Sequence, residues 1–341
     1  MVAMPHLPTP AKPTATRKDV ARLAGVSTAV VSYVVNGGPK RVSPATEAKV
    51  REAIAVLGYR PNAAARALKL GSSEMLGMVV PDMTSPFFAT LAHAVEEAAA
   101  ARGYALLMVN SGGSLAAERR AVEHLASRRV DGVFLSSVLF EPDLRELEAV
   151  EIPAVLLNHS TESPGFDSVG VDFVQAGRDA VDHLVSHGHR NIGLVMGIST
   201  SGDLDGREAG WRMGLERAGL PIGPVMRQHF DRDGGYQAGK WLLNSSERPT
   251  AVFASSDLIA VGLLRAFHEG GVRVPEDVAI VSFDGLAESE YCWPPLTTLA
   301  QPVEEMAQAA VEALVGGGGH KSNRRFSATL VRRASCGCAA P

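Results

Sequence analysis

Clusters of polar residues follow most of the apolar runs in the long C-terminal part of the chain, and their side chains are suited to binding a polar ligand. Carboxylates, amides and hydroxyls of this kind form hydrogen bonds with a hydroxyl-rich or heterocyclic solute. The sequence has no Gly-rich phosphate loop with its lysine, no nucleophile elbow and no paired-carboxylate motif, so it predicts binding and not catalysis. The clusters are Asp82–Ser85, Asn110–Gly113, Ser136–Ser137, Asn158–His159, Ser199–Ser201, Ser255–Asp257 and Asp284–Gly285.

Two further motifs contain residue types that bind metals. Cys336-Gly337-Cys338 suggests a metal or redox pair, but no second pair with zinc spacing is evident. His187-Gly188-His189 does not have the spacing of two ligands on one helix. We therefore expect no metal site and no cofactor. The chain has three cysteines in all, too few for a disulfide framework, which indicates a reducing compartment.

The elements that must position the polar clusters form an alternating series of strands and helices. Apolar runs such as 75–80 and 278–283 alternate with helical patterns such as 115–127 and 257–269. This alternation predicts parallel α/β units whose sheets are covered on both faces. The series divides near Asp172, which predicts two lobes separated by a cleft. Ligands of such sheets lie at the carboxyl ends of the strands, so the polar clusters should line that cleft.

The N-terminal part of the chain is basic, whereas the rest is acidic. Residues 1–72 contain eleven Lys or Arg and three Asp or Glu, a net charge of +8; the remainder contains 22 basic and 34 acidic residues, a net charge of −12. A small cationic module on an anionic body favours a nucleic-acid-binding head, although a merely solvated basic face is the alternative. No apolar run approaches the ~20 residues of a membrane span. Residues 1–15 are Pro-rich without a signal-peptide core, so we expect a disordered leader.

The basic part contains the pattern of a helix-turn-helix domain. A helix over 18–24 is interrupted by a glycine, and Ser27 is suited to cap a second helix over 28–35. Two short helices joined by a Gly-containing turn are typical of this motif. A third helix over 43–58 starts with a capping serine and ends at a glycine. Residues 16–60 are therefore predicted to bind DNA, with the second helix in a major groove.

A short hinge connects this head to the body. Residues 61–72 have the alanines and the capping asparagine of a helix, but fall below the ~12–15 residues that an isolated helix needs. We expect the hinge helix to order only on DNA, with Leu68 as an apolar wedge in the minor groove; ordinary hinge packing of Leu68 is the alternative. The remaining residues, 73–341, form the effector-binding and dimerisation core, with lobe 1 at about 73–170 and 300–325 and lobe 2 at about 171–299 and 326–341.

The segments 16–37, 42–68 and 75–91 resemble the lactose/galactose-repressor (LacI/GalR) family, and the resemblance extends from about Thr16 to Arg333. It implies an all-α, three-helix helix-turn-helix head plus hinge helix, followed by an α/β, two-lobed, periplasmic-binding-protein-like core with parallel sheets. It also implies a homodimer whose recognition helices read the two half-sites of a pseudo-palindromic, double-stranded operator. No leucine heptad follows the last strand, so we expect dimers and not tetramers.

The resemblance implies roles for particular residues of the head. Val30 stands where many members have Thr, and Tyr33 where some have Arg, so a different operator sequence is expected. Tyr33 could alternatively pack in the core of the head. The predicted DNA-binding residues are Thr16, Ser27, Thr28, Ala29, Ser32, Tyr33, Asn36, Tyr59, Asn62, Ala65 and Leu68, with Thr28, Ala29 and Tyr33 at base edges and Ser27, Ser32, Asn36 and Tyr59 holding phosphate or packing the head.

For the core, the resemblance implies an effector site between the lobes. Arg207 corresponds to the arginine that anchors the effector, and Asp284 to an effector-binding aspartate, a couple that favours closure around a polar ligand. Asn158 replaces a frequent Asp, and Ser256 a frequent Asn. Arg207 could instead cap a helix or bridge the lobes. The predicted effector-binding residues are Phe87, Asn158, Arg207, Phe230, Ser256, Asp257 and Asp284, of which Phe87 could belong to the core and Asp257 could be only a helix N-cap.

We therefore expect a cytoplasmic, dimeric transcriptional repressor that is not an enzyme and has no membrane partner. Its operator affinity would be controlled by a small molecule, expected to be a carbohydrate, bound between the lobes. The sequence does not distinguish an inducer from a co-repressor. Two alternatives remain: a solute-binding protein without DNA regulation, and a regulator controlled by a protein co-effector.

Overall fold

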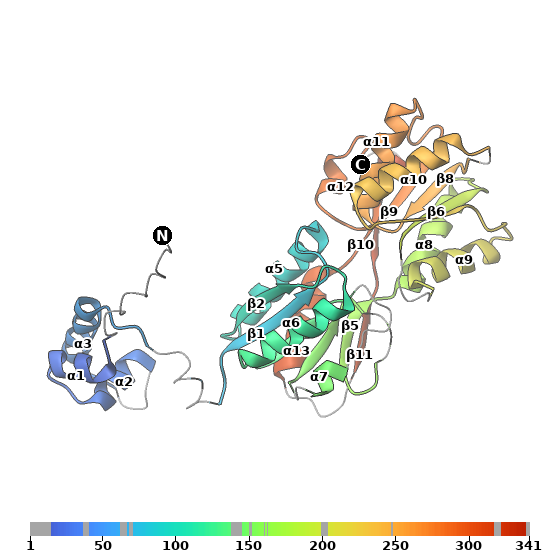
Figure 1. The fold of residues 1–341 in the computed structure, drawn as a ribbon. Coiled ribbons are helices and arrows are strands. Elements are labelled where there is room, and N and C mark those ends of the chain that lie inside the picture. Colours follow the sequence, from blue (N-terminus) through green and yellow to red (C-terminus); the bar gives the residue numbers. More distant parts are fainter. Residues whose placement is uncertain are drawn as a thin grey trace, which may run out of the picture. The chain divides into compact units, whose positions relative to one another are not determined.

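The computed structural model describes residues 15–36, 41–61, 67, 71–137, 145–149, 152–159, 161, 163–198, 204–246, 248–316 and 322–338. The chain divides into two compact units, residues 1–73 and 74–341, called the head and the core below (Figure 1). The predicted leader, apart from residue 15, lies outside the described residues, as do the hinge residues Asn62, Ala65 and Leu68. The predictions made for these residues stay predictions.

Three helices form the head, and capping side chains set where they begin. The helices are α1 (Arg17–Ala24), α2 (Thr28–Asn36) and α3 (Pro44–Leu57). Thr16 begins α1 with a capping box, because Asp19 N donates to Thr16 Oγ1 and Thr16 N donates to Asp19 Oδ2. The hydroxyls of Ser27 and Ser43 each accept an N–H from the first turn of the helix that follows, at 3.3 Å in both cases. The predicted starts of the second and third helices are thereby confirmed.

Glycines end the first and third helices of the head. Gly25 follows α1 with φ 65°, and Gly58 follows α3 with φ 59°, the left-handed conformation that glycine adopts without steric cost. The helices pack around a small apolar cluster, against which Val30 and Tyr59 lie partly buried. Its fully buried members are Val20, Ala21, Val31, Val50 and Ala53.

The first lobe of the core is a six-stranded parallel sheet with helices on both faces (Figure 1). Its elements are β1 (Met75–Val80), α5 (Pro86–Ala100), β2 (Ala105–Asn110), α6 (Leu115–Ser127), β3 (Gly132–Leu135), α7 (Arg145–Ala149), β4 (Ala154–Leu157), β5 (Asp167–Val171), α13 (Val303–Val315) and β11 (Asn323–Phe326). The strand order is β11-β5-β4-β3-β1-β2. Met78 and Val80 pack with α5 and α13, whereas Val79 packs with α6, because successive strand residues point to opposite faces. Two covered faces explain the nearly continuous apolar strands.

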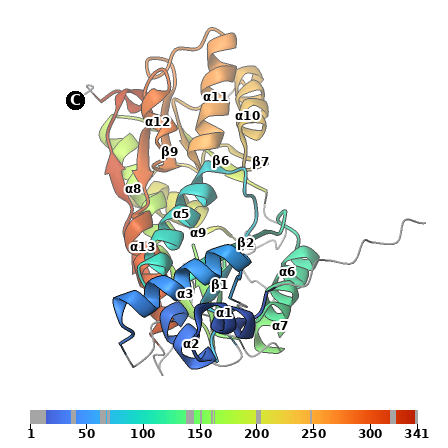
Figure 2. The ribbon, with the colours of Figure 1, turned by 90° about the vertical axis from the view of Figure 1, so that its left-hand side faces the viewer.

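The second lobe repeats this architecture with one antiparallel edge strand (Figure 2). Its elements are α8 (Phe173–Ser186), β6 (Ile192–Gly197), α9 (Gly206–Arg217), β7 (Val225–Gln228), α10 (Arg232–Asn244), β8 (Ala251–Ala254), α11 (Asp257–Glu269), β9 (Ala279–Asp284), α12 (Glu288–Tyr291), β10 (Thr297–Ala300), β12 (Thr329–Val331) and the 3₁₀ helix η1 (Ala334–Cys336). The strand order is β12-β10-β9-β8-β6-β7. Helices α8 and α9 pack together, as do α10 and α11, and the two pairs contribute to different apolar clusters.

The chain passes between the lobes three times: from β5 to α8, from β10 to α13, and from β11 to β12. Each lobe is therefore assembled from segments that are distant in the sequence. The sequence from residue 325 onward indicates one last strand and a short tail. The structure has two strands in this region, of which β11 pairs with β5 and β12 pairs with β10. The helix-turn-helix head and the two-lobed parallel α/β core are confirmed.

None of the helices within the described ranges combines the length and the apolar character needed to cross a bilayer.

Candidate functional site

A cavity of about 360 Å³ lies between the two lobes, at the carboxyl ends of their strands. Ligand sites of α/β sheets occupy this position, and the volume is within the range of about 300–1,000 Å³ that small-molecule sites have. The cavity contains polar groups from both lobes together with aromatic walls. Six of the seven predicted effector-binding residues line it: Phe87, Asn158, Arg207, Phe230, Ser256 and Asp284.

Arg207 lies in the first turn of α9, and its guanidinium is fixed by a carboxylate. Its Nε and Nη2 donate to Asp205 Oδ1 and Oδ2 at 2.9 and 2.7 Å, a bidentate ion pair, and its Nη1 donates to the carbonyl oxygen of Ser255 at 3.1 Å. Burial alone would lower the pKa of Arg207. The charge and hydrogen bonds of Asp205, and more weakly the charge of Asp284, outweigh burial, so the net effect is a raised pKa. These contacts occupy three of the five guanidinium N–H groups.

Three aromatic rings surround this guanidinium. The rings of Phe173 and Phe230 each have their centroid 5.1 Å from Arg207 Cζ, and that of Phe283 lies at 5.5 Å. Phe230 can take this place only because residue 197, at the end of β6, is a glycine: a Cβ there would lie 1.7 Å from Phe230 Cε2. The charge of Arg207 is therefore held by one carboxylate and three rings, at a defined place in the cavity wall.

Asp284 is the last residue of β9 and has an unusual backbone conformation for an aspartate. Its φ of 118° lies in the region that favours glycine, the kind of strain that is found at ligand sites. Its Oδ1 accepts a hydrogen bond from Gln301 Nε2 at 3.0 Å. Burial, together with the nearby Asp257 carboxylate, raises the pKa of Asp284 well above its usual range, while Arg207 opposes that rise.

Two buried acceptors in the cavity wall have no donor among the residues that the structure describes. They are Asn158 Oδ1 and Gln301 Oε1. Asn158 follows β4 with φ 58°, a conformation that asparagine tolerates better than most residues. A buried polar atom without a partner costs about 1–3 kcal/mol, so both atoms are suited to accept hydrogen bonds from a ligand.

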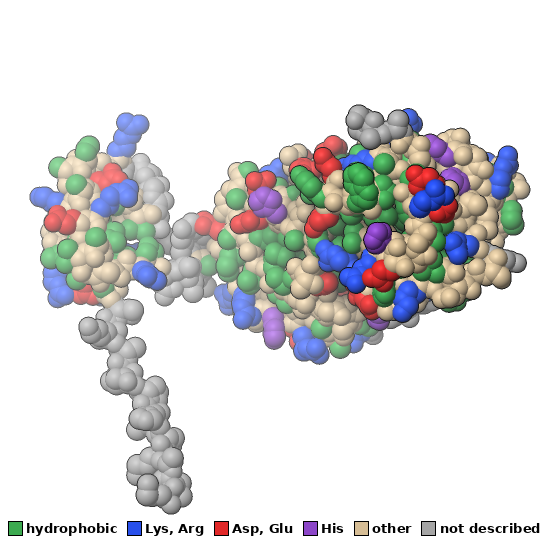
Figure 3. Space-filling view, turned by 90° about the horizontal axis from the view of Figure 1, so that it is seen from above, with side chains coloured by type: hydrophobic (Ala, Val, Ile, Leu, Met, Phe, Trp, Pro, Cys, Tyr) green, Lys and Arg blue, Asp and Glu red, His purple; other side chains and the backbone are tan. Residues whose placement is uncertain are grey.

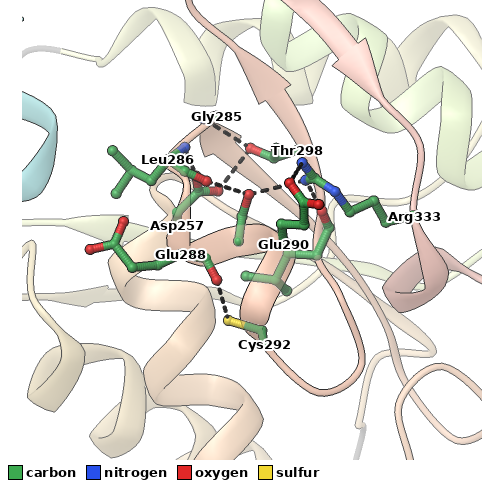
Figure 4. A network of polar contacts seen from close by, with 10 residues as sticks. Asp257, Gly285, Leu286, Glu288, Glu290, Cys292, Thr298 and Arg333 are labelled. Atoms are coloured by element: carbon green, nitrogen blue, oxygen red, sulfur yellow. Dashed lines mark hydrogen bonds and ion pairs between the residues drawn. The ribbon is translucent and has the colours of Figure 1, made fainter. Parts of the chain in front are cut away.

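Asp257, the seventh predicted residue, is not among the residues that line the cavity. Its carboxylate accepts hydrogen bonds within a separate polar network (Figure 4). Its Oδ1 accepts hydrogen bonds from Ser282 Oγ at 2.5 Å and Thr298 Oγ1 at 2.8 Å, and its Oδ2 accepts one from Leu286 N at 2.6 Å. These bonds tie the start of α11 to β9, to the segment after β9 and to β10. The N-cap of α11 is Ser256, not Asp257. We therefore leave Asp257 out of the proposed ligand contacts.

Polar residues outside the predicted effector-binding set also line the cavity. Asp82, Ser85, Ser137 and His159 belong to the polar clusters that were predicted to lie in the cleft. Asp205, Thr161, Arg227, His229 and Gln301 were not predicted, although Gln301 directly follows β10, so the rule that polar residues after strands form the site would have found it. Burial lowers the pKa of His159, whose Nε2 lies 2.7 Å from Thr161 Oγ1.

The head presents the start of α2 as the candidate DNA interface. Thr28 and Ala29 are exposed in its first turn, next to the capping Ser27. Ser32 and Tyr33 are half-buried on the same helix, and Tyr33 is not among the residues of the apolar cluster. Exposed residues at the N-terminal end of a recognition helix are the ones that reach base edges.

Two other predicted head residues have structural contacts: Thr16 caps α1, and Tyr59 packs against the apolar cluster. Asn36 is the last residue of α2. Val30 also packs against the cluster, which gives a structural reason for an apolar residue at this position. Lys and Arg side chains are visible on the head beside Asp and Glu side chains, and the visible face of the core also carries both kinds (Figure 3).

A helix-turn-helix head joined to a two-lobed core with a polar cavity defines a ligand-responsive DNA-binding regulator. Residues 16–62 match the model of the bacterial regulatory proteins of the lacI family, and residues 181–336 match a periplasmic binding protein-like domain. The chain is 35% identical over 305 residues to the transcriptional repressor PurR of Photobacterium profundum (88% of this chain and 91% of that sequence). It is also 35% identical over 305 residues to the ribose operon repressor of Escherichia coli K12 (88% of this chain and 92% of that sequence).

Solved structures give the same result. The Lac repressor dimer bound to operator and an anti-inducer superposes with a TM-score of 0.83 at 30% identity, covering 94% of this chain and 99% of that chain. A regulator from Enterococcus faecium with bound ribose has a TM-score of 0.69 at 29% identity, covering 76% of this chain and 98% of that chain. The chain belongs to the LacI family of bacterial regulatory proteins. It is a DNA-binding transcriptional repressor with an effector-binding core, as predicted.

Proposed function

We propose that the effector of this repressor is an uncharged, polyhydroxylated molecule of monosaccharide size, bound between the lobes. The observation that carries the proposal is the pair of unpartnered acceptors, Asn158 Oδ1 and Gln301 Oε1, in the same cavity as the Asp284 carboxylate. Neighbouring hydroxyls can donate to these acceptors while accepting from the two remaining N–H groups of Arg207. Phe87 and Phe230 supply the apolar walls against which the face of a sugar ring packs.

The charges around the cavity argue against an anionic effector. Asp205 already neutralises the guanidinium of Arg207 through two hydrogen bonds, and Asp284 lies close enough to interact with the same guanidinium. A carboxylate or phosphate would therefore have to compete with a bidentate pair. A neutral ligand with many hydrogen-bond donors can bind without displacing Asp205 from Arg207. The ribose operon repressor and the ribose-bound Enterococcus regulator are relatives whose names agree with this class of ligand.

We further propose that the protein binds a pseudo-palindromic operator as a homodimer. Thr28, Ala29 and Tyr33 would read base edges, Ser27, Ser32, Asn36 and Tyr59 would hold phosphates or position the head, and the hinge residues Asn62, Ala65 and Leu68 would act in the minor groove. The dimer of the Lac repressor on its operator supports this arrangement. A ligand that fixes the relative orientation of the lobes would change operator affinity, and operator would change ligand affinity by the same factor.

The effector is tested by thermal shift and calorimetry on the full chain with pentoses, hexoses, sugar phosphates and nucleobases. We expect at least one neutral sugar to raise the melting temperature. Gln301→Ala should reduce this shift at a given sugar concentration, whereas Gln237→Ala, at an exposed position on α10, should retain it in full. Binding of only a nucleobase or a phosphorylated compound would overturn the proposed ligand class.

The coupling to DNA is tested by gel shift with a library of palindromic duplexes, with and without the sugar identified above. Sugar binding that leaves DNA affinity unchanged would support a solute-binding role in place of regulation. Operator binding that responds to a protein and to none of the small molecules would support a protein co-effector. A change in operator affinity that Gln301→Ala removes supports the proposal.

A further inference from the structure

Two histidines and two cysteines meet at the far end of the second lobe, away from the effector cavity. His183 lies in the last turn of α8 and His187 directly follows that helix, four residues later, so both side chains project from the same face. Cys336 ends η1, and Cys338 lies two residues further on. Their ligand atoms all lie within 4.8 Å of one another. We refer to His183, His187, Cys336 and Cys338 as the His/Cys cluster.

The two sides of the cluster are held by separate parts of the lobe. Ser335 anchors η1, because its N–H donates to Pro295 O at 3.0 Å and its Oγ donates to Ile280 O at 2.7 Å. Thr297 Oγ1 donates to Cys336 Sγ at 2.9 Å. Helix α8 is fixed independently by its packing against α9 and β9. The cluster is therefore preformed by the fold, as a specific binding site must be.

Three of the six distances between the ligand atoms match the edges of one tetrahedral zinc site. With Zn–S bonds of about 2.3 Å and Zn–N bonds of about 2.0–2.1 Å, a tetrahedron places nitrogen and sulfur ligands about 3.5 Å apart. His183 Nε2 lies 3.2 Å from Cys336 Sγ and 3.8 Å from Cys338 Sγ, and His187 Nε2 lies 3.4 Å from Cys338 Sγ. All three separations are within about 0.3 Å of the expected edge.

The burial of the four side chains gives the site a closed side and an open side. Cys336 is 1% exposed and His183 is 7% exposed, whereas His187 is exposed and Cys338 is half-buried. A cation can enter from solvent past the last two residues and reach the buried pair.

We propose that the His/Cys cluster binds one Zn²⁺ in a tetrahedral, structural His₂Cys₂ site. Four protein ligands leave no open coordination position, which distinguishes a structural site from a catalytic one. On binding, two Zn–S and two Zn–N bonds form, and the two thiol protons pass to solvent. The ion would join α8, which follows the first crossover between the lobes, to the segment after β12, which follows the third. The sequence shows no second pair of zinc ligands close to Cys336 and Cys338. In the structure, His183 and His187 provide that second pair.

The proposal is tested on the full chain purified without a histidine tag, by measuring zinc by mass spectrometry. We expect about one zinc per chain in the parent protein. His187→Gln and Cys338→Ser, which alter the two more accessible ligands, should each reduce this content several-fold. The matched controls are His189→Gln and Cys292→Ser, because His189 bonds to Thr250 and Cys292 bonds to the carbonyl of Glu288, both outside the cluster. The controls should retain the zinc.

Cobalt substitution reports the geometry of the site. Co²⁺ bound to the apoprotein should give sulfur-to-cobalt charge transfer and the strong visible bands of tetrahedral coordination, and Cys338→Ser should weaken both. Removal of the ion by a chelator should lower the melting temperature of the parent by about 5 °C or more and leave that of Cys338→Ser unchanged. A parent protein with no more zinc than the two ligand variants, or with a Cys336–Cys338 disulfide and no metal after purification under reducing conditions, would overturn the proposal.

Discussion

The side-chain amide of Gln301 donates a hydrogen bond to the Asp284 carboxylate at 3.0 Å, so a residue of the second crossover is linked to the strained end of β9. Gln301 is 8% exposed, and its Oε1 has no partner among the described residues. The same side chain thus orients one proposed ligand contact and provides another. Because it lies where the chain passes from one lobe to the other, a ligand bound to it contacts the connection between the lobes directly.

Replacing Gln301 with alanine should weaken sugar binding about 10- to 100-fold. The change removes one hydrogen bond to the ligand and the one that orients the Asp284 carboxyl group, each worth about 0.5–1.5 kcal/mol. Isothermal titration calorimetry measures the loss. Gln301→Glu should bind sugar more weakly still, because it replaces the donating amide with a second acidic group beside Asp284. Unchanged affinity in the alanine variant would show that the ligand does not reach this part of the cavity.

Sugar affinity and the stability of the free protein should respond to pH in opposite directions. The pKa of Asp284 is raised by burial and by Asp257, so the folded protein keeps a proton on this group in a pH window above the usual aspartate range. Since the unfolded chain binds fewer protons in that window, the free energy of unfolding falls as pH rises through it. Affinity for a hydroxyl donor should rise over the same window as the carboxylate ionises. Asp284→Asn should flatten both profiles, measured by chemical denaturation and by calorimetry.

Gly197→Ala should reduce sugar affinity while leaving the fold intact. The added methyl would occupy the place of the Phe230 ring, which is 39% exposed and free to swing outward. The displaced ring loses its contact with Arg207, worth about 0.5–1 kcal/mol at an exposed site, and no longer forms a wall of the cavity. We expect affinity to fall about 3- to 10-fold with little change in melting temperature. Phe230→Ala should reproduce the effect; if it binds sugar normally, the ring is not a ligand contact.

Thr28→Ala should weaken specific operator binding by about 1–3 kcal/mol, the range for a well-placed base contact. The residue is exposed at the start of α2, so the fold should not change. Binding to unrelated duplex DNA, and its dependence on salt, should be retained because the charges of the head are unaltered. Thr46→Ala, at the start of α3, is the control. Fluorescence anisotropy with operator and scrambled duplexes measures both quantities; an equal loss on both duplexes would exclude a base-reading role.

The sequence predicted the parts of the fold that depend on local periodicity and capping. The helix starts at Ser27 and Ser43 follow from hydrogen-bonding chemistry, and the apolar strands β1 and β9 follow from burial on two faces. Strand β5 was not predicted, because its sequence, DSVGV, contains Asp, Ser and Gly and is a strand only through its pairing with β4 and β11. The last strand segment is divided into β11 and β12 because each pairs with a strand of a different lobe. The local sequence pattern does not indicate this division.

The sequence indicated cavity residues that stand in recognisable motifs. It did not indicate contacts between residues that are distant in the sequence. Arg207 and Asp284 stand in recognisable positions, and both line the cavity. Asp257 has the same chemistry, but Ser282 and Thr298 take up its carboxylate, which only the three-dimensional structure shows. The His/Cys cluster joins residues about 150 positions apart, and the more obvious neighbour of His187, His189, turns out to bond Thr250 instead.

The three crossovers also constrain how the polypeptide is made. The sheet of the first lobe is completed only by β11 and that of the second by β12, both within the last twenty residues of the structured chain. A nascent polypeptide emerging from the ribosome therefore exposes the unpaired edges of β5 and β10 until synthesis is nearly finished. Premature termination a short distance before residue 323 would leave both edges open, so such fragments should aggregate or be degraded and not act as shortened regulators.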